Sequence, residues 1–302
     1  MIYRYHGFSN WVIHRLPDEP PGQYTFGFEL EVQRKRTCEL SNDKMANKII
    51  EACGDLFVFE HDGSIGDGFE IISHPMTWKY FNRNINIFIK LLKLLDENKY
   101  KSHDGGKCGL HVHVSRNHLP LDEQIYWITN INFILERFQT EIYKFSRRDY
   151  LEHPSNGSYC KSLTEKIRLD NGHESINKDR IKEIIKSDSR NDRYVNLNLC
   201  NQKTIEFRMF RGTLNWNTFF LSLNLINNIV NQALLRDNII DWKSLVLHGL
   251  DGNQKEKCIQ YCVKREIDMD EIVVIKLIDS AEKVVKRRTY KAKDLLLQLE
   301  TE

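Results

Sequence analysis

The sequence predicts an α+β protein, and three observations carry this prediction. Several short stretches alternate between apolar and polar side chains, which is the pattern of strands buried on one face; they are 25–32, 69–73, 108–115 and 204–210. Longer stretches carry apolar residues three and four positions apart, as amphipathic helices that pack on a sheet do. The stretches 193–199 and 204–210 alternate on either side of a short turn, which predicts an antiparallel hairpin.

The first half of the chain begins with an irregular segment over residues 1–23, whose prolines disfavour regular structure and which we expect to pack on the domain surface. A strand over 25–32 follows. Apolar spacing predicts a short helix over 41–54, with Gly54 at its end. Strands are predicted over 56–60 and 69–73, separated by glycine turns, and a long amphipathic helix over 78–98.

The second half begins with the strand over 108–115 and a second long helix over 119–142, which starts with a proline and acidic residues. Residues 144–192 are polar and carry little helical pattern, so we interpret them as a loop that covers a substrate. After the hairpin, 219–235 reads as a buried helix. The pattern of residues 237–302 predicts a mainly helical extension, in which we identify no catalytic or binding motif.

Composition narrows the class of protein. The 302 residues are 41% hydrophobic, enough for a globular core. Lys plus Arg (44) nearly balance Asp plus Glu (42), and the net charge of +2 gives no reason to expect a nucleic-acid partner. Seven cysteines without a CxxC pair fit a reducing compartment, and no apolar run is long enough to span a membrane. We therefore expect a cytoplasmic protein without a membrane or nucleic-acid partner.

Four of the predicted strands carry ionisable side chains on their polar faces. Alternation places these residues on the faces opposite the apolar ones: Glu29, Glu31, Glu70, His111, His113, Glu206 and Arg208. Any one of these rows could be an ordinary solvated face, but together they indicate a site. The set is rich in oxygen ligands, with few imidazoles and no paired thiolates, which favours Mg²⁺ or Mn²⁺ over zinc. No glycine-rich phosphate loop is present, so metal and arginine would have to hold a nucleotide's phosphates.

These residues stand in a series of motifs: GFELE at 27–31, DGS at 62–64 with GFEI at 68–71, CGLHVHVS at 108–115, and TIEFR at 204–208 with RGTL at 211–214. The motifs, in this order, resemble those of the amidoligases, which belong with glutamine synthetase and glutamate–cysteine ligase to the carboxylate–amine ligase superfamily. The resemblance implies a glutamine synthetase-like catalytic fold, with an antiparallel sheet curved into a half-barrel and helices on its convex face. It implies a catalytic domain over 24–236 that contains the loop 144–192. Residues 237–302 would pack on the same domain.

The resemblance also implies ATP, two or more Mg²⁺ (or Mn²⁺) ions and roles for individual residues. Metal ligands would be Glu29, His111 and Glu206 for the ion at the ATP phosphates, and Glu31 and Glu70 for the ion nearer the carboxylate substrate; Asp62 or Glu60 is a candidate for a further ligand there. Arg208 and Arg211 would stabilise the transferring phosphoryl group. His113, Ser115 and Arg208 would contact the nucleotide, and Arg147, Arg148, Tyr159 and Arg193 would contact substrate.

The expected activity is an ATP-dependent ligase that joins a small-molecule or peptide carboxylate to an amine through an acyl phosphate. Such an intermediate needs protection from water, which the loop 144–192 could provide. Two alternatives remain open. A metal-dependent hydrolase could use the same side chains to activate water, and a binding module could keep the fold without catalysis. The sequence does not identify the two substrates.

Overall fold

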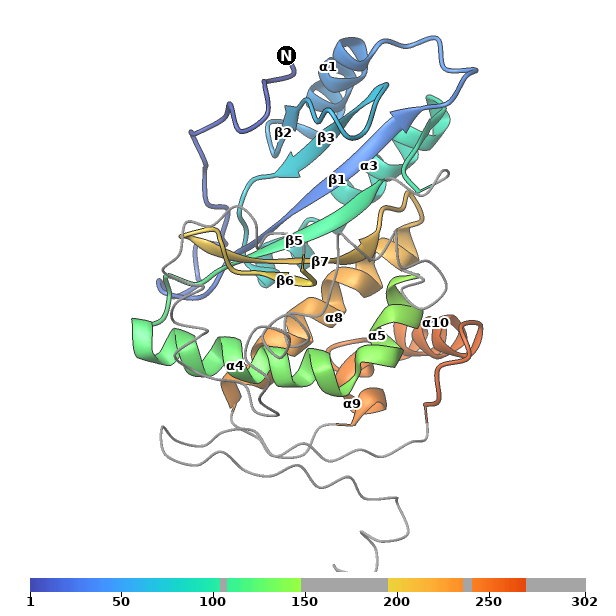
Figure 1. Cartoon of the computed structure of the whole chain (residues 1–302). Helices are drawn as coiled ribbons and strands as arrows, with labels where there is room; N and C mark the ends of the chain where they lie inside the picture. The colour runs from blue at the N-terminus through green and yellow to red at the C-terminus, as the bar shows by residue number, and fades with distance from the viewer. Residues whose placement is uncertain (104–107, 148–194, 236–240, 270–302) are drawn as a thin grey trace, which may run out of the picture. The chain divides into compact units, whose positions relative to one another are not determined.

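The structure is a computed structural model that describes residues 1–103, 108–147, 195–235 and 241–269 (Figure 1). Arg148, Tyr159, Arg193 and almost all of the predicted loop 144–192 lie outside these residues. The chain divides into two compact units. The first comprises Met1–His118 and Asn201–Phe220, and the second comprises Leu119–Cys200 and Leu221–Glu302. The helix α8 (Trp216–Leu235) begins in the first unit and continues in the second.

The first unit is built on an antiparallel sheet with the strand order β2-β3-β1-β5-β7, and β4 also pairs with β1 (Figure 1). The strands are β1 (Phe26–Arg34), β2 (Phe57–Glu60), β3 (Gly68–Ser73), β4 (Tyr100–Lys101), β5 (Gly109–Ser115) and β7 (Thr204–Arg211). The sheet is open. The predicted α+β class is confirmed.

Helices cover the apolar face of this sheet. They are α1 (Asn42–Cys53), α2 (Trp78–Arg83), α3 (Ile85–Glu97) and the first turn of α8. Phe28 of β1 is fully buried and packs edge to face against Phe88 of α3 and Phe219 of α8. Aromatic pairs of this geometry add to the energy of area burial. The polar face is left for the ionisable side chains.

The helix predicted over 78–98 is interrupted at Asn84, where α2 ends and α3 begins. The side-chain amide of Asn84 donates a hydrogen bond to the carbonyl of Tyr80 at 2.9 Å. Asparagine competes for helix hydrogen bonds in this way, which favours helix ends. Apolar spacing continues across the break and so does not reveal it.

The second unit is mainly helical. Its elements are α4 (Leu121–Arg137), α5 (Gln139–Ser146), β6 (Leu197–Asn198), the remainder of α8, α9 (Trp242–Leu247) and α10 (Gly252–Val263). The indole N–H of Trp127 in α4 donates to the carbonyl of Val230 in α8 at 2.9 Å. Tyr261 of α10 donates its hydroxyl hydrogen to the carbonyl of Phe145 at 2.7 Å. Within the described part of the chain, no helix combines the length and apolarity that a membrane span requires.

Two predicted elements of this unit differ from the structure. The single helix over 119–142 is two helices, α4 and α5, which meet at the buried Phe138. The first arm of the hairpin has only Leu197–Asn198 in strand conformation among its described residues. The carboxamide oxygen of Asn198 accepts the N–H of Cys200 at 3.0 Å, and this local turn ends the strand.

Candidate metal and phosphate site

Strand register brings the predicted ionisable residues onto one face of the sheet. Directly opposite residues in an antiparallel pair point to the same side. The cross-strand partners are Glu29 with His111, His113 with Glu206, Glu31 with Glu70, and Glu60 with Glu70. The face opposite the helices is therefore lined by acidic and imidazole groups from five strands, and we call it the polar face.

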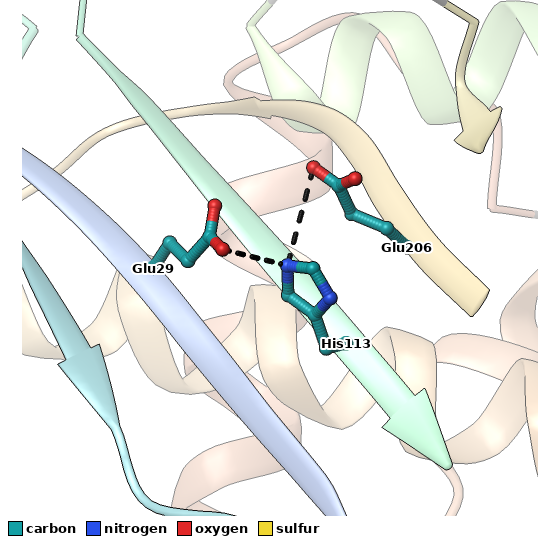
Figure 2. A group of neighbouring side chains, drawn as sticks. All are labelled: Glu29, His113 and Glu206. Atoms are coloured by element: carbon teal, nitrogen blue, oxygen red, sulfur yellow. Dashed lines mark ion pairs between the residues drawn. The ribbon is translucent and has the colours of Figure 1, made fainter. Parts of the chain in front are cut away.

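A first cluster joins Glu29, His113 and Glu206, whose ligand atoms lie within 4.8 Å of one another (Figure 2). The Nε2 atom of His113 lies 3.0 Å from Oε1 of Glu29 and 4.0 Å from Oε1 of Glu206. Nδ1 of the same ring lies 3.2 Å from the hydroxyl of Thr204. The hydroxyl orients the imidazole so that Nε2 faces both carboxylates.

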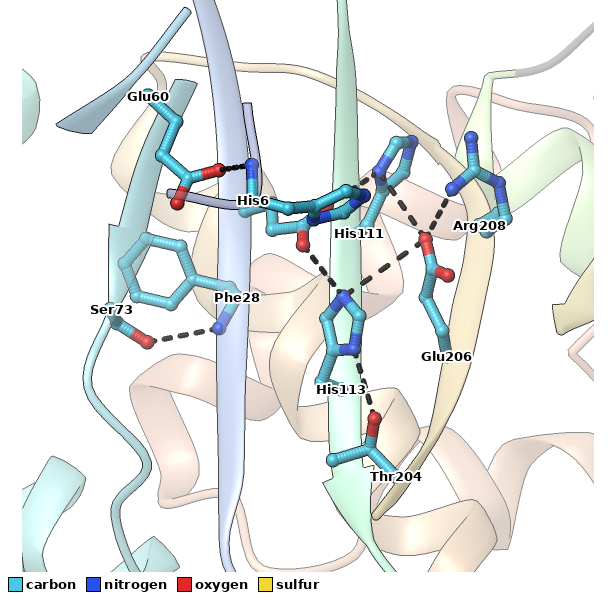
Figure 3. Close-up of polar contacts among 10 residues, drawn as sticks. His6, Phe28, Glu60, Ser73, His111, His113, Thr204, Glu206 and Arg208 are labelled. Atoms are coloured by element: carbon cyan, nitrogen blue, oxygen red, sulfur yellow. Dashed lines mark hydrogen bonds and ion pairs between the residues drawn. The ribbon is translucent and has the colours of Figure 1, made fainter. Parts of the chain in front are cut away.

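His111 adjoins this cluster from the opposite side of the same carboxylates. Its Nδ1 lies 3.2 Å from Oε2 of Glu29 and 3.5 Å from Oε1 of Glu206 (Figure 3). The sequence prediction gave His111 to the metal and His113 to the nucleotide. Both rings reach the same two carboxylates, so the division of roles between them stays a prediction.

Charges in the first cluster stabilise one another. Burial alone would lower the pKa of His113, but the carboxylates of Glu29 and Glu206 outweigh it and raise that pKa to about 9. Burial would likewise raise the pKa of Glu29, yet His113 and His111 hold it well below its usual range. The pKa of Glu206 is lowered against burial by His113 and by Arg208, whose guanidinium donates to it. The imidazolium of His113 balances the charge of the two carboxylates that it faces.

A second cluster joins Glu31, Asp62 and Glu70, again with ligand atoms within 4.8 Å of one another. Oε2 of Glu31 accepts the backbone N–H of Gly109 at 2.6 Å. Burial, followed by the charges of Glu29, Glu31 and Asp62, raises the pKa of Glu70 to about 10. The metal-free cluster therefore keeps a proton on Glu70, because three ionised carboxylates cannot share so small a buried space.

The donor sets of both clusters fit divalent cations. Carboxylate oxygens, with one imidazole in the first cluster, are the ligands that Mg²⁺ and Mn²⁺ prefer. A cation at the second cluster would replace the proton on Glu70, and one at the first would replace the positive charge of His113. The chemistry that the sequence predicted for this face is compatible with its geometry.

A β-bulge in β7 determines where the arginines lie. Phe207 pairs with Val112 and Phe210 with Leu110, so Arg208 and Met209 together oppose the single residue His111. One extra residue reverses the alternation after it. Arg211 therefore pairs with Gly109 beside Glu31 on the polar face, while Phe210 is buried on the apolar face.

A comparison with known protein families decides the family. The sequence model described as "Putative amidoligase enzyme" matches residues 33–230, more than half of the chain. This protein belongs to that amidoligase family. The resemblance found in the sequence motifs is thereby confirmed.

Other comparisons add less about this amidoligase. The crystal structure of the complex between prokaryotic ubiquitin-like protein Pup and its ligase PafA is similar at 11% sequence identity and a TM-score of 0.29, over 81% of this chain and 57% of that one. The amidoligase thus spans somewhat more than half of that chain's length. No curated protein sequence matches it.

The remaining predicted site residues of the amidoligase fall in different places. The hydroxyl of Ser115 accepts the N–H of Thr25 at 2.8 Å, at the end of β5 where Thr204 is its cross-strand partner. Arg147 is half-buried at the end of α5, in the second unit, and adopts a left-handed conformation with φ of 60°.

Asp62 is the residue that the sequence singled out least clearly. The DGS turn marked it, but the sequence left the choice between Asp62 and Glu60 open. The structure groups Asp62 with Glu31 and Glu70. The carboxylate of Glu60 instead accepts the backbone N–H groups of His6 and Phe8 at 2.7 and 3.3 Å. Sequence patterns do not reveal which of these two carboxylates joins the cluster, because the partners of Glu60 depend on where the N-terminal segment lies.

Proposed function

We propose that this amidoligase is an ATP- and Mg²⁺-dependent carboxylate–amine ligase that forms an amide bond through an acyl phosphate. The observation that carries the proposal is the pair of carboxylate clusters on adjoining parts of one sheet face, in a chain of the amidoligase family. Glu29 and Glu31, two residues apart on β1, connect them. Two cation sites flanked by arginines suit the transfer of a phosphoryl group from a nucleotide.

Each cluster would hold one metal ion. Glu29, Glu206 and one or both of His111 and His113 would bind the ion at the ATP phosphates. Glu31, Asp62 and Glu70 would bind the ion nearer the carboxylate substrate. When bound, the ions neutralise charge on the phosphoryl oxygens and polarise the bond to the leaving ADP.

The reaction requires two substitutions. A carboxylate oxygen of the first substrate attacks the γ-phosphorus, the bond to the bridging oxygen breaks, and ADP leaves. The amine nitrogen of the second substrate then attacks the acyl carbon, inorganic phosphate leaves with the former carboxylate oxygen, and the nitrogen loses a proton. A carboxylate is otherwise a poor acyl donor, which is why ATP is consumed.

Arg208 and Arg211 would stabilise the negative charge that moves during these steps. Burial opposes the charge on Arg208, but Glu206 and Glu29 outweigh it and keep its pKa raised. The guanidinium is thus fixed beside the first cluster by its bond to Glu206. Donors held in place before the reaction stabilise developing charge at little cost in reorganisation. Arg147, Arg148, Tyr159 and Arg193 stay proposals as contacts to the carboxylate and amine substrates.

Calorimetric titration of Mg·ATP tests the proposal. Wild-type protein should bind Mg·ATP, and should bind ATP far more weakly in the presence of a chelator. Glu29→Gln and Glu206→Gln should abolish the Mg²⁺-dependent part, because each removes a charged ligand but keeps the shape and a hydrogen-bonding oxygen. Glu97→Gln, an exposed carboxylate on α3, is the matched control and should bind as wild type does.

Failure of folded wild-type protein to bind Mg·ATP, alone or with a mixture of amino acid and peptide carboxylates, would contradict the ligase proposal. The metal-dependent hydrolase would then be favoured, and it predicts cleavage of amide substrates with divalent metal and no nucleotide. If binding is found, release of ADP in the presence of carboxylate and amine pairs identifies the substrates.

A further inference from the structure

The N-terminal segment is joined to the outer edge of the sheet. The N–H of Tyr3 donates to the carbonyl of Phe59 at 2.8 Å, and the N–H of His61 donates to the carbonyl of Tyr3 at 3.0 Å. These bonds form a parallel bridge beside β2, at the edge of the sheet that would otherwise present unpaired backbone groups. The second bond holds His61, the residue immediately before Asp62, against the N-terminal segment.

Glu60 holds the next part of the segment on the polar face. Its side chain points to that face because its cross-strand partner is Glu70, and it is 2% exposed. The carboxylate accepts the N–H of His6 through Oε2 (Figure 3). Its Oε1 accepts the N–H of Phe8. Residues 6–8 therefore lie on the polar-face side of β2, next to the cluster of Glu31, Asp62 and Glu70.

A strained turn makes this contact possible. His6 has φ of 56°, and the N–H of Gly7 donates to the carbonyl of Arg4 at 2.7 Å. A left-handed conformation is unfavourable for a residue other than glycine, because its Cβ approaches the following carbonyl oxygen. Surrounding contacts must offset this cost, and the N–H of His6 itself donates to the buried carboxyl group of Glu60 at 2.7 Å.

Glu60 of β2, Glu70 of β3 and Glu31 of β1 are neighbours in the cross-strand register, and their side chains have different partners. Glu31 accepts the N–H of Gly109, Glu70 lies between Glu31 and Glu60 in the cross-strand register, and Glu60 accepts the two N–H groups of the N-terminal segment. Both oxygens of Glu60 are thus engaged by backbone. Asp62, two residues after Glu60, is the third carboxylate of the cluster with Glu31 and Glu70.

We infer that the N-terminal clamp, defined as residues 3–8 with Glu60 and His61, positions Asp62 and Glu70 for a divalent cation, and that Glu60 is a positioning residue and not a ligand. The inference rests on the proposed function, since it assumes a cation at the second cluster. Groups that hold metal ligands in place from outside the coordination sphere change metal affinity when they are altered.

Manganese binding provides the test, with free Mn²⁺ measured by electron paramagnetic resonance during titration of the chelator-treated full-length protein. His6→Pro removes the N–H that Glu60 accepts, and proline cannot adopt a positive φ. His6→Gly keeps the N–H and favours the same φ, so it is the matched control. We expect His6→Pro to weaken one of two classes of Mn²⁺ site by about 10- to 100-fold, with the other class unchanged and His6→Gly equal to wild type.

A second variant separates a positioning role from direct ligation. Glu60→Gln keeps the side-chain shape but has one accepting oxygen in place of two, so it loses one of the two bonds to the clamp and should weaken the same class of site in the same range as His6→Pro. Loss of that class in Glu60→Gln together with wild-type binding in His6→Pro would make Glu60 a ligand and overturn the inference. Phe8→Pro, which removes the other N–H, replaces His6→Pro if thermal unfolding shows that the latter does not fold.

The outcomes also distinguish this inference from the proposed function. Unchanged Mn²⁺ affinities in His6→Pro and Glu60→Gln, in a protein that still binds Mg·ATP, overturn the clamp alone. Absence of Mn²⁺ binding by wild-type protein overturns both the clamp and the ligase proposal.

Discussion

Replacing Glu70 with glutamine should stabilise the metal-free protein while removing its second metal site. Burial and the neighbouring carboxylates raise the pKa of the Glu70 carboxyl group from its ordinary value of 4.5 to about 10 in the folded chain. The folded protein therefore holds a proton that the unfolded chain releases at neutral pH. Stability must fall as the pH rises between these two values, because the folded state binds the extra proton. Glutamine is neutral at every pH and can still donate to Asp62.

The size of the effect follows from linkage. One proton bound differentially changes the free energy of unfolding by about 1.4 kcal/mol per pH unit. Between about pH 6 and pH 8, Glu70 should therefore cost wild-type protein on the order of 3 kcal/mol. Other groups that titrate in this range do so in wild type and variant alike, so the difference between their pH dependences isolates Glu70.

Urea denaturation with a chelator present, followed by circular dichroism at both pH values, measures this difference. Glu70→Gln should lose less stability than wild type between the two pH values, by the amount above. Added Mg²⁺ should stabilise wild type more than the variant at the higher pH, because the variant keeps the first cluster and loses the second metal site. Equal pH dependence in the two proteins would refute the reasoning, since Glu70 would then be ionised or solvated in the folded state.

Two further predictions concern the first cluster and the backbone beneath the site. The pKa of His113 is raised from 6.5 to about 9, so its contribution to stability is fully present below pH 6.5 and is lost as the pH rises through 9. His113→Asn should therefore lower the free energy of unfolding by on the order of 3 kcal/mol near pH 6 and by little at high pH. A loss of stability that does not depend on pH, measured by urea denaturation, would contradict this. Gly68→Ala should destabilise the protein by about 1–3 kcal/mol, because the added methyl group would meet the carbonyl oxygen of Val32 and the side chain of Ile65. Gly63→Ala is the control, since nothing lies within 4 Å of the carbon added there. Equal thermal unfolding midpoints for the two alanine variants would contradict that second prediction.

The sequence predicted the polar face because alternation is strict in the strands that build it. A residue's side in a half-buried strand follows from its position relative to buried neighbours, so Glu29 and His113 could be placed before the structure was known. Cross-strand register could not be predicted in the same way. The pairing of Glu31 with Glu70, and hence the second cluster, depends on which strands are neighbours in the sheet.

Local interruptions also escaped prediction. Apolar periodicity continues through Asn84 and Phe138, where two helices are broken, because a change in backbone direction need not change which residues are buried. The N-terminal segment reads as irregular from its prolines, and nothing in residues 1–23 indicates that backbone N–H groups there serve a carboxylate far along the chain. Contacts of this kind depend on tertiary structure and have no periodic pattern.

The bulge in β7 gives this strand one position at which it can lose a residue. Deleting Met209 would leave Arg208 alone opposite His111, while Phe210 would still pair with Leu110 on the apolar face and Arg211 with Gly109 on the polar face. A residue inserted between Phe210 and Arg211 would instead turn Arg211 toward the core. Natural or engineered variants of this strand should therefore tolerate the loss of a residue at the bulge more readily than a change of length beyond it.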